Sequence, residues 1–203
     1  MIPSERSPTP KELLDHLFLV LSSDRFLKKQ GLGNEVPFFI CPYPPEQAVA
    51  VEALRVSLTV QLANRGIRVL EVNLYDLAID LLKARGIWET VLASEPDVTK
   101  PELKELLQGV LDPEKHLVPE IAKRIMGAEF EIMFLSGIGE VFPYIRSHNV
   151  LNNLQSTAKE QPTIMFFPGQ YTHGLATGAS LDLFGLLHDD KYYRAFNLLR
   201  YEV

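Results

Sequence analysis

The sequence has almost no cysteine and no long apolar run. Its single cysteine, Cys41, cannot form an intrachain disulfide, and no segment approaches the roughly 18 to 20 consecutive apolar residues that a membrane-spanning helix requires. Residues 1–11 are polar and rich in proline, unlike a secretory signal peptide. These absences predict a cytoplasmic protein of a reducing compartment, without membrane contact.

Positive charge is also scarce. The 203 residues include 20 Lys and Arg against 26 Asp and Glu, which gives a formal net charge of −6 and a pI near 5.4. A protein that binds the nucleic-acid backbone unaided carries a basic surface, so the charge balance argues against direct DNA binding. The hydrophobic share of 46% and the charged share of 23% are ordinary for a globular chain. We expect a single domain over residues 1–203, in which residues 1–8 form a flexible tail.

Patterns typical of metal ligands and catalytic nucleophiles are missing as well. No two histidines have the H-x-x-x-H spacing; the five are scattered, at His16, His116, His148, His173 and His188. Ser136 lies in Leu-Ser-Gly-Ile-Gly and not in the G-x-S-x-G of a nucleophile elbow. Cys41 ends an apolar run and is expected to be buried rather than reactive. The sequence therefore predicts no metal, no cofactor and no enzyme activity.

What the sequence does contain is an alternation of short apolar runs with amphipathic segments. Strands are predicted at 36–41, 67–72, 129–135 and 163–167. Helices are predicted between Thr9 and Gly31, between Pro45 and Asn64, and at 73–85, 117–127 and 141–158, with a helical tendency over 87–112. Strands separated by helices, without β-hairpin signals, predict a three-layer α/β fold with a mostly parallel sheet and helices on both faces.

Local sequence signals indicate where two helices begin and which elements follow in the last quarter of the chain. Thr9 and Glu12 are placed to form a capping box around Pro10, and Asn73 begins a predicted cap for the third helix. Three further segments are assigned by composition: a loop at 170–180, rich in Gly and Thr, a short helix at 181–188, and a last strand or helix at 193–200.

The segment 136–140, Ser-Gly-Ile-Gly-Glu, follows the third predicted strand. In an open α/β sheet, ligands bind beyond the carboxyl ends of the strands. A P-loop requires a lysine after its glycines, but the next lysine is Lys159, and Phe142 stands where a dinucleotide fingerprint requires its third glycine. Glu140 falls at the expected helix start, where its carboxylate would repel a phosphate. We expect a P-loop-like or Rossmann-like fold without a phosphate-binding motif, and glycines that serve a turn of positive φ.

Polar side chains gather on the predicted helix 141–158. Arg146, His148, Asn152 and Asn153 lie along it, although asparagines inside a helix are mildly costly. Two interpretations stay open: a solvated helix face, or a polar face that binds a specific partner. Acid–base chemistry by His148 is a weaker third, because no carboxylate nearby in the sequence pairs with it.

Aromatic residues follow the fourth predicted strand and recur near the C-terminus. Tyr171 ends the segment Phe-Phe-Pro-Gly-Gln-Tyr at the same sheet edge, and Tyr192-Tyr193-Arg194 comes later. Tyrosine and arginine are common at the centres of protein interfaces. A role in the core is an equal alternative for one of these tyrosines.

Several of these motifs are distinctive when they are taken together. They are Pro-Phe-Phe-Ile at 37–40, Leu-Ser-Gly-Ile-Gly-Glu-Val-Phe-Pro at 135–143, Arg-Ser-His at 146–148, Leu-Asn-Asn-Leu-Gln at 151–155, Phe-Pro-Gly-Gln-Tyr at 167–171, Leu-Phe-Gly at 183–185 and Tyr-Tyr-Arg-Ala-Phe at 192–196. The chain thereby resembles the BrxB family of BREX bacteriophage-resistance systems, from about residue 10 to residue 200. One departure is the segment 172–180, which is longer than the family pattern.

The resemblance implies a cytoplasmic bacterial defence component. Such a component acts in a set that includes a DNA methyltransferase, an AAA+ ATPase and PglZ, a protein similar to alkaline phosphatases. PglZ is the partner that the resemblance leads us to expect. The family supplies no established catalytic residues, so none is transferred to this chain.

We therefore expect a non-enzymatic adaptor or scaffold that binds a larger defence protein. Its partner or ligand surface is expected to include Gly137, Gly139, Glu140, Arg146, His148, Asn152, Asn153 and Tyr171. The alternative is a nucleotide-binding or hydrolytic enzyme with a pocket at the Gly137–Gly139 turn. In that alternative Arg146 would hold an anion and His148 would move a proton.

Overall fold

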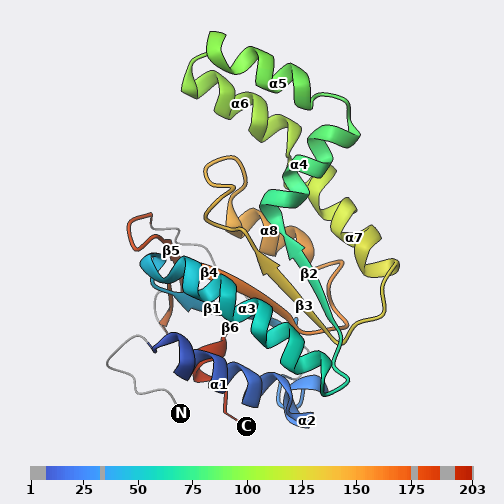
Figure 1. Cartoon of the computed structure of the whole chain (residues 1–203), viewed down its shortest axis with the longest axis vertical. Coiled ribbons are helices and arrows are strands. Elements are labelled where there is room, and N and C mark those ends of the chain that lie inside the picture. Colours follow the sequence, from blue (N-terminus) through green and yellow to red (C-terminus); the bar gives the residue numbers. More distant parts are fainter. Residues whose placement is uncertain (1–7, 33–34, 175–177, 188–194, 203) are drawn as a thin grey trace.

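A computed structural model describes residues 8–32, 35–174, 178–187 and 195–202 (Figure 1). Almost all of the predicted tail, residues 1–7, lies outside the described residues. The helices are α1 (Pro10–Leu21), α2 (Asp24–Leu27), α3 (Ala48–Ala63), α4 (Leu74–Ala84), α5 (Trp88–Ser94), α6 (Lys100–Val110), α7 (Val118–Met126) and α8 (Ser147–Leu154). The strands are β1 (Phe38–Tyr43), β2 (Val69–Asn73), β3 (Ile132–Ser136), β4 (Thr163–Gly174), β5 (Gly178–Leu183) and β6 (Phe196–Asn197).

The sheet has the strand order β2-β3-β4-β1-β6, and each of these pairs is parallel. Met165 of β4 lies between Ile40 of β1 and Leu135 of β3, which fixes the register of the three central strands. β5 is the exception, because it pairs antiparallel with the outer half of β4. The prediction of a mostly parallel α/β sheet is confirmed.

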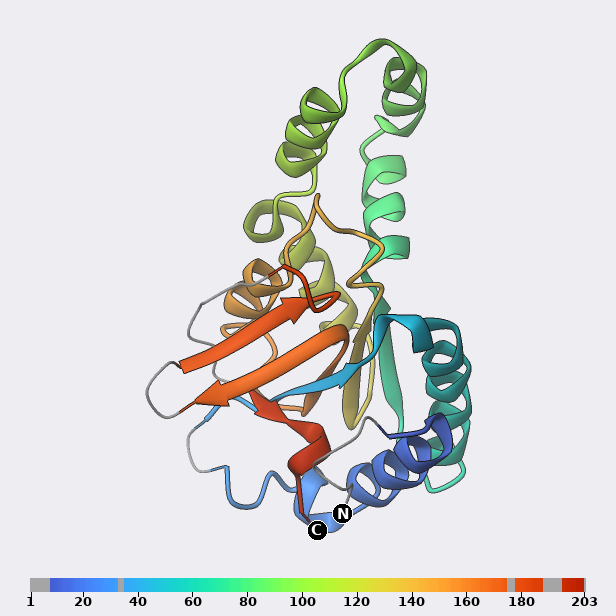
Figure 2. The same cartoon turned by 90° about the vertical axis from the view of Figure 1, so that its left-hand side faces the viewer.

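Side chains of the central strands alternate between two apolar cores. Phe39, Cys41 and Phe166 point into a core that includes residues of α1 and α3, whereas Phe38 and Phe167 point into a core with residues of α4, α7 and α8. This alternation follows from the two-residue period of a strand. Figure 2 shows the sheet between its two helical layers, so the predicted three-layer arrangement is also confirmed.

The first helix starts as the sequence predicts and ends earlier. Thr9 and Glu12 form a reciprocal capping box. The predicted helix up to Gly31 is interrupted after Leu21, because Ser23 Oγ accepts a hydrogen bond from Phe26 N and starts α2. Serine side chains compete for backbone groups in this way at helix ends.

The predicted helix over 141–158 is wrong in its first half. Residues 137–145 form turns, in which the amides of Tyr144 and Ile145 both donate to Val141 O, at 2.9 and 3.0 Å. Pro143 explains the difference, because it has no amide hydrogen and its ring obstructs a preceding helical turn. Only α8, the second half, is helical.

The predicted loop at 170–180 and helix at 181–188 are also wrong within the described residues. β4 continues through Pro168 and Gly169 to its end at Gly174, and β5 folds back against it, with Tyr171 opposite Leu181. A Cβ at Gly169 would collide with Asp182 O, so glycine permits the close approach of the two strands. The last predicted element, 193–200, is a short strand, β6, followed by a 3₁₀ turn at Leu198–Arg200; residues 193–194 lie outside the described part.

α5 and α6 project beyond the sheet as a helical arm (Figures 1 and 2). The helical tendency predicted for residues 87–112 is therefore confirmed. At the base of the arm, Arg85 Nη1 donates to Val110 O at 2.6 Å, and Gln108 Nε2 donates to Pro143 O at 3.0 Å. The second bond connects the arm to the turns that follow β3.

Candidate functional site at the carboxyl edge of the sheet

The candidate site is built where β2 and β3 end side by side. Asn73, the last residue of β2, lies opposite Ser136, the last residue of β3. Asn73 Oδ1 accepts hydrogen bonds from the amides of Tyr75, at 2.8 Å, and Asp76, at 3.3 Å. The predicted cap is confirmed, and two amides of the first turn of α4, those of Tyr75 and Asp76, already have a partner.

Gly137 lies directly against this cap. Its φ is +75°, which confirms the predicted turn of positive φ, and an added Cβ would collide with Asn73 Oδ1 and lie 3.0 Å from Tyr75 N. Only glycine combines that dihedral angle with so close an approach. The space beside the start of α4, where a nucleotide-binding fold would hold a phosphate, is filled by the backbone of Gly137 and the side chain of Asn73.

Gly139 is needed for a different reason. It is not among the described glycines with positive φ, but a Cβ there would lie 3.0 Å from a ring carbon of Phe184 and 3.1 Å from Pro168 Cγ. The turn after β3 therefore packs against the end of the β4–β5 hairpin. Sequence reasoning did not foresee this contact, because the hairpin itself was not predicted.

Glu140 and Arg146 are both exposed on this edge. The expectation that Glu140 begins a helix is wrong, since α8 begins at Ser147. Arg146 takes the N-cap position of α8 and makes no capping hydrogen bond with its side chain. Both charges are free of a helix-capping role and accessible to a partner.

The other predicted residues of α8 have unequal access to solvent. Asn152 is exposed, whereas His148 is buried. Asn153 is half-buried, and its Nδ2 donates to Asn149 O at 2.7 Å, within the same helix. Of these three, only Asn152 presents a fully accessible side chain, so the polar set does not form one continuous exposed face.

Tyr171 joins the β4–β5 hairpin to the C-terminal segment. Its side chain is buried, and its hydroxyl donates to Ala195 O at 2.6 Å. Burial raises the pKa of Tyr171 to about 12, because the phenolate would lose its hydration. Of the two roles considered for these tyrosines, Tyr171 has the core one; Tyr192 and Tyr193 lie outside the described residues.

A set of partly or fully exposed apolar side chains lies at the same edge of the sheet. We define the edge patch as Glu140, Phe142, Phe184, Leu186 and Leu187. The rings of Phe142 and Phe184 meet edge-to-face with centroids 6.4 Å apart, and Leu186 is 85% exposed. The sequence signal for this patch is the Leu-Phe-Gly-Leu-Leu run at 183–187, which is unusually apolar for a turn.

Metal ligands and the cysteine thiol were the groups considered for chemistry in the sequence. No cluster of three or more His, Cys, Asp or Glu side chains able to hold a metal occurs there. Cys41 is buried as predicted, and burial raises the pKa of its thiol to about 12, opposite to the direction that activates a nucleophile. Among the described helices, none is long and apolar enough to cross a membrane.

Comparison with known proteins identifies relatives over most of the chain. The family model described as "BREX protein BrxB" matches residues 70–198. The BREX protein BrxB of Bacillus cereus (strain H3081.97) is 33% identical over 197 residues, which is 93% of this chain and 96% of the relative. The BREX protein BrxB of Escherichia coli O9:H4 (strain HS) is 31% identical over 179 residues, covering 88% of this chain and 86% of the relative. No solved structure matches the chain.

The family match covers the turn after β3, α8 and the β4–β5 hairpin, which together form the carboxyl edge. The match and the two relatives agree with the resemblance drawn from the sequence motifs. The chain therefore belongs to the BrxB family of BREX proteins.

Proposed function

We propose that this BREX protein is a non-enzymatic adaptor that binds a larger protein of its defence system through the edge patch. The observation that carries the proposal is the exposure of apolar side chains at Phe184, Leu186 and Leu187, next to the turn that bears the exposed Glu140, because Gly139 of that turn packs against the ring of Phe184. Exposed apolar groups with a polar rim are typical of protein interaction sites. In contrast to these exposed side chains, the thiol of Cys41, which could act as a nucleophile, is buried in the core.

PglZ is the partner that we propose first. Membership of the BrxB family places the chain in a system of several proteins, and PglZ is the large, phosphatase-like member of that set. The net charge of −6 favours a partner with an apolar or basic surface. It also disfavours direct contact with DNA, which would give a steep dependence of affinity on salt.

A co-purification experiment tests this proposal. Tagged chain is used to capture the neighbouring BREX proteins, with and without DNA, and we expect PglZ to be retained in both conditions. The double substitution Phe184→Glu and Leu186→Glu should reduce retention at least tenfold, because it introduces two charges into the apolar centre of the patch. The sequence-based surface is tested in parallel by Arg146→Glu with Asn152→Ala.

The matched control is Leu19→Glu. Leu19 lies on α1 and is 60% exposed, so its substitution adds the same type of charge at a different place. Retention of PglZ should be unchanged in this control. Equal retention by the wild type and the Phe184→Glu, Leu186→Glu variant would contradict the assignment of the edge patch.

The enzyme alternative predicts a different result. Calorimetric titration with ATP or GTP and Mg²⁺ should give no saturable heat if the chain is an adaptor. Tight nucleotide binding that is abolished by Arg146→Ala would instead favour a nucleotide site at the Gly137–Gly139 turn, since Arg146 is the exposed cation nearest to it in the sequence.

A further inference from the structure

α3 is apolar on two opposite faces. One face, with Leu54, Leu58 and Leu62, is buried against the sheet. On the other face Val49 is 87% exposed, Val56 is 53% exposed and Val60 is 57% exposed. We define the α3 seam as these three valines and the two exposed alanines between and beyond them: Val49, Ala53, Val56, Val60 and Ala63.

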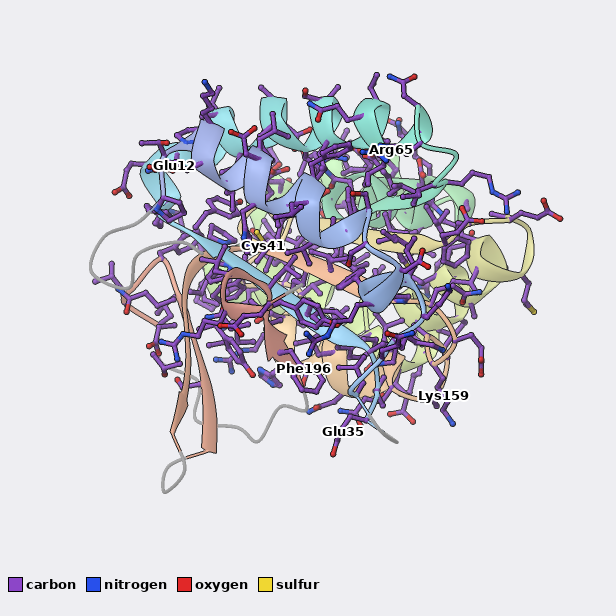
Figure 3. All side chains as sticks on the ribbon, turned by 90° about the horizontal axis from the view of Figure 1, so that it is seen from below. Glu12, Glu35, Cys41, Arg65, Lys159 and Phe196 are labelled. Atoms are coloured by element: carbon purple, nitrogen blue, oxygen red, sulfur yellow. The ribbon has the colours of Figure 1, made fainter. Side chains whose placement is uncertain are left out.

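The spacing of the seam is that of a helix-pairing surface. Its members follow one another at intervals of four, three, four and three residues, the apolar period of two helices packed side by side. At about 3.6 residues per turn, all five lie within roughly 40° of one line along the helix. The five seam residues are all exposed, and Figure 3 shows the α1–α3 layer, to which α3 belongs, above the sheet residue Cys41.

The composition of this face does not suit a solvated helix. Valine is a poor helix former because its branched side chain is restricted in a helix, so exposed positions usually carry other residues. Between Ala48 and Asn64 the charged residues are Glu52 and Arg55, and these two form an ion pair with each other at 2.5 Å. Arg55 is further held by Glu71 of β2. The seam is thus flanked by few charges that would keep another apolar surface away.

The seam is complementary to itself when it is reversed. Its order of residues is nearly symmetric about Val56, so an antiparallel copy places Val49 against Ala63 and Ala53 against Val60, with Val56 facing its own counterpart. In the pairs on either side of Val56 a valine then meets an alanine, which allows two helices to interdigitate closely. From this geometry we infer that the α3 seam binds the α3 seam of a second copy of this chain, in an antiparallel pair with twofold symmetry.

The charges at the two ends of α3 select the antiparallel direction. Glu46 lies just before the helix and Arg65 just after it, and both are exposed. An antiparallel pair brings Glu46 of each copy to Arg65 of the other, whereas a parallel pair would bring like charges together. The guanidinium of Arg65 lies over the ring of Phe18, with its central carbon 5.6 Å from the ring centroid, which keeps Arg65 at this end of the helix.

Sedimentation velocity over a range of concentrations tests the pairing. We expect the wild type to pass from monomer to dimer as concentration rises. Val56→Glu should leave only monomer, because two carboxylates would face each other on the twofold axis. Leu19→Glu, an equally exposed substitution on α1, should still dimerise. A wild type that is monomeric at every concentration, or a Val56→Glu variant that dimerises like it, would overturn the inference.

Circular dichroism melting of each variant separates loss of pairing from loss of folding. Val56 is about half exposed, so its substitution should not unfold the chain. Should Val56→Glu nevertheless unfold, Val49→Glu is the second variant, since Val49 is more exposed still. The same loss of dimer is expected, and an unchanged dimer would contradict the seam.

Single-cysteine crosslinking tests the register, because native Cys41 is buried and does not compete. With a short bismaleimide, Val56→Cys should crosslink to its own counterpart. Val49→Cys and Ala63→Cys should not do so singly, since the two copies of position 49 would lie roughly 20 Å apart along the pair. The double variant with both cysteines should crosslink. Crosslinking of Val49→Cys alone, or none with Val56→Cys, would overturn the antiparallel register.

This inference is independent of the proposed adaptor function. The α3 seam and the edge patch share no residue, so the substitutions that test one leave the other intact. A monomeric chain that retains PglZ would overturn the pairing alone, and a dimer that fails to retain PglZ would contradict the adaptor proposal alone.

Discussion

Gly137 has two requirements at one position: a positive φ and space next to Asn73 Oδ1. The sequence motif predicted the first but not the second. The reason is physical, because a turn of positive φ is a local property of the chain, whereas the cap on α4 reaches Gly137 only after β2 and β3 have paired. At the scale of single residues, the motif therefore identified the position and the structure supplied its cause.

Gly137→Ala should destabilise the fold by about 2 kcal/mol or more, because alanine meets both an unfavourable φ and a collision. Gly86→Ala is the matched control: its φ is +68° and nothing lies within 4 Å of an added Cβ, so the expected cost is only about 1 kcal/mol. Urea unfolding followed by circular dichroism measures both. Equal losses of unfolding free energy for the two substitutions would show that the contact with Asn73 does not contribute to stability.

Cys41 gives the fold a dependence on alkaline pH. Burial raises the pKa of its thiol from 9.0 to about 12. A raised folded-state pKa means that stability is complete below the unfolded pKa of 9.0 and is lost as pH rises toward 12, since the unfolded thiol ionises first. The free energy of unfolding should therefore fall above pH 9.0.

Cys41→Ala should make that fall less steep, and the comparison of unfolding curves near neutral pH and above pH 9.0 measures the difference. A residual slope is expected in the variant, because burial also raises the pKa of Tyr43 and of Tyr171 to about 12. An identical pH dependence in both proteins would refute the role of the thiol.

At the scale of elements, the sequence predicted the parallel strands and the capped helices well and the carboxyl edge poorly. Capping by Thr9 and by Asn73 needs only a few neighbouring residues. The β4–β5 hairpin depends instead on Gly169 accepting the close approach of Asp182 O. Its inward residues Leu181 and Leu183 form too short an alternation to be recognised in the sequence. The turn after β3 was predicted from the sequence, but Phe184, Leu186 and Leu187 of the edge patch directly follow β5, the strand that was not predicted.

The arm offers a test of capping at this scale. Thr99 and Glu102 form a capping box at the start of α6, in which Thr99 Oγ1 donates to Glu102 Oε2 at 2.7 Å. Thr99→Ala should destabilise α6 by about 1 kcal/mol and speed amide hydrogen exchange there. Thr90→Ala, at an exposed position inside α5, is the control and should leave exchange in α6 unchanged. Equal exchange in the two variants would count against the capping box.

At the scale of the whole molecule, three properties matter together: the two apolar cores, the exposed apolar surfaces and the acidic net charge. Two apolar cores hold a mostly parallel sheet, and Gly137 lies directly against the Asn73 cap at the start of α4. Apolar side chains remain exposed at the edge patch and on α3. These exposed apolar surfaces and the acidic net charge are the basis on which we propose contacts with other proteins of the BREX system rather than with nucleic acid.

The most direct test of this role is a calorimetric titration of purified PglZ with the purified chain. We predict saturable binding that does not require nucleotide and that the Phe184→Glu, Leu186→Glu variant weakens at least tenfold. An adaptor role would be contradicted if PglZ gave no binding while ATP with Mg²⁺ bound saturably at the Gly137–Gly139 turn.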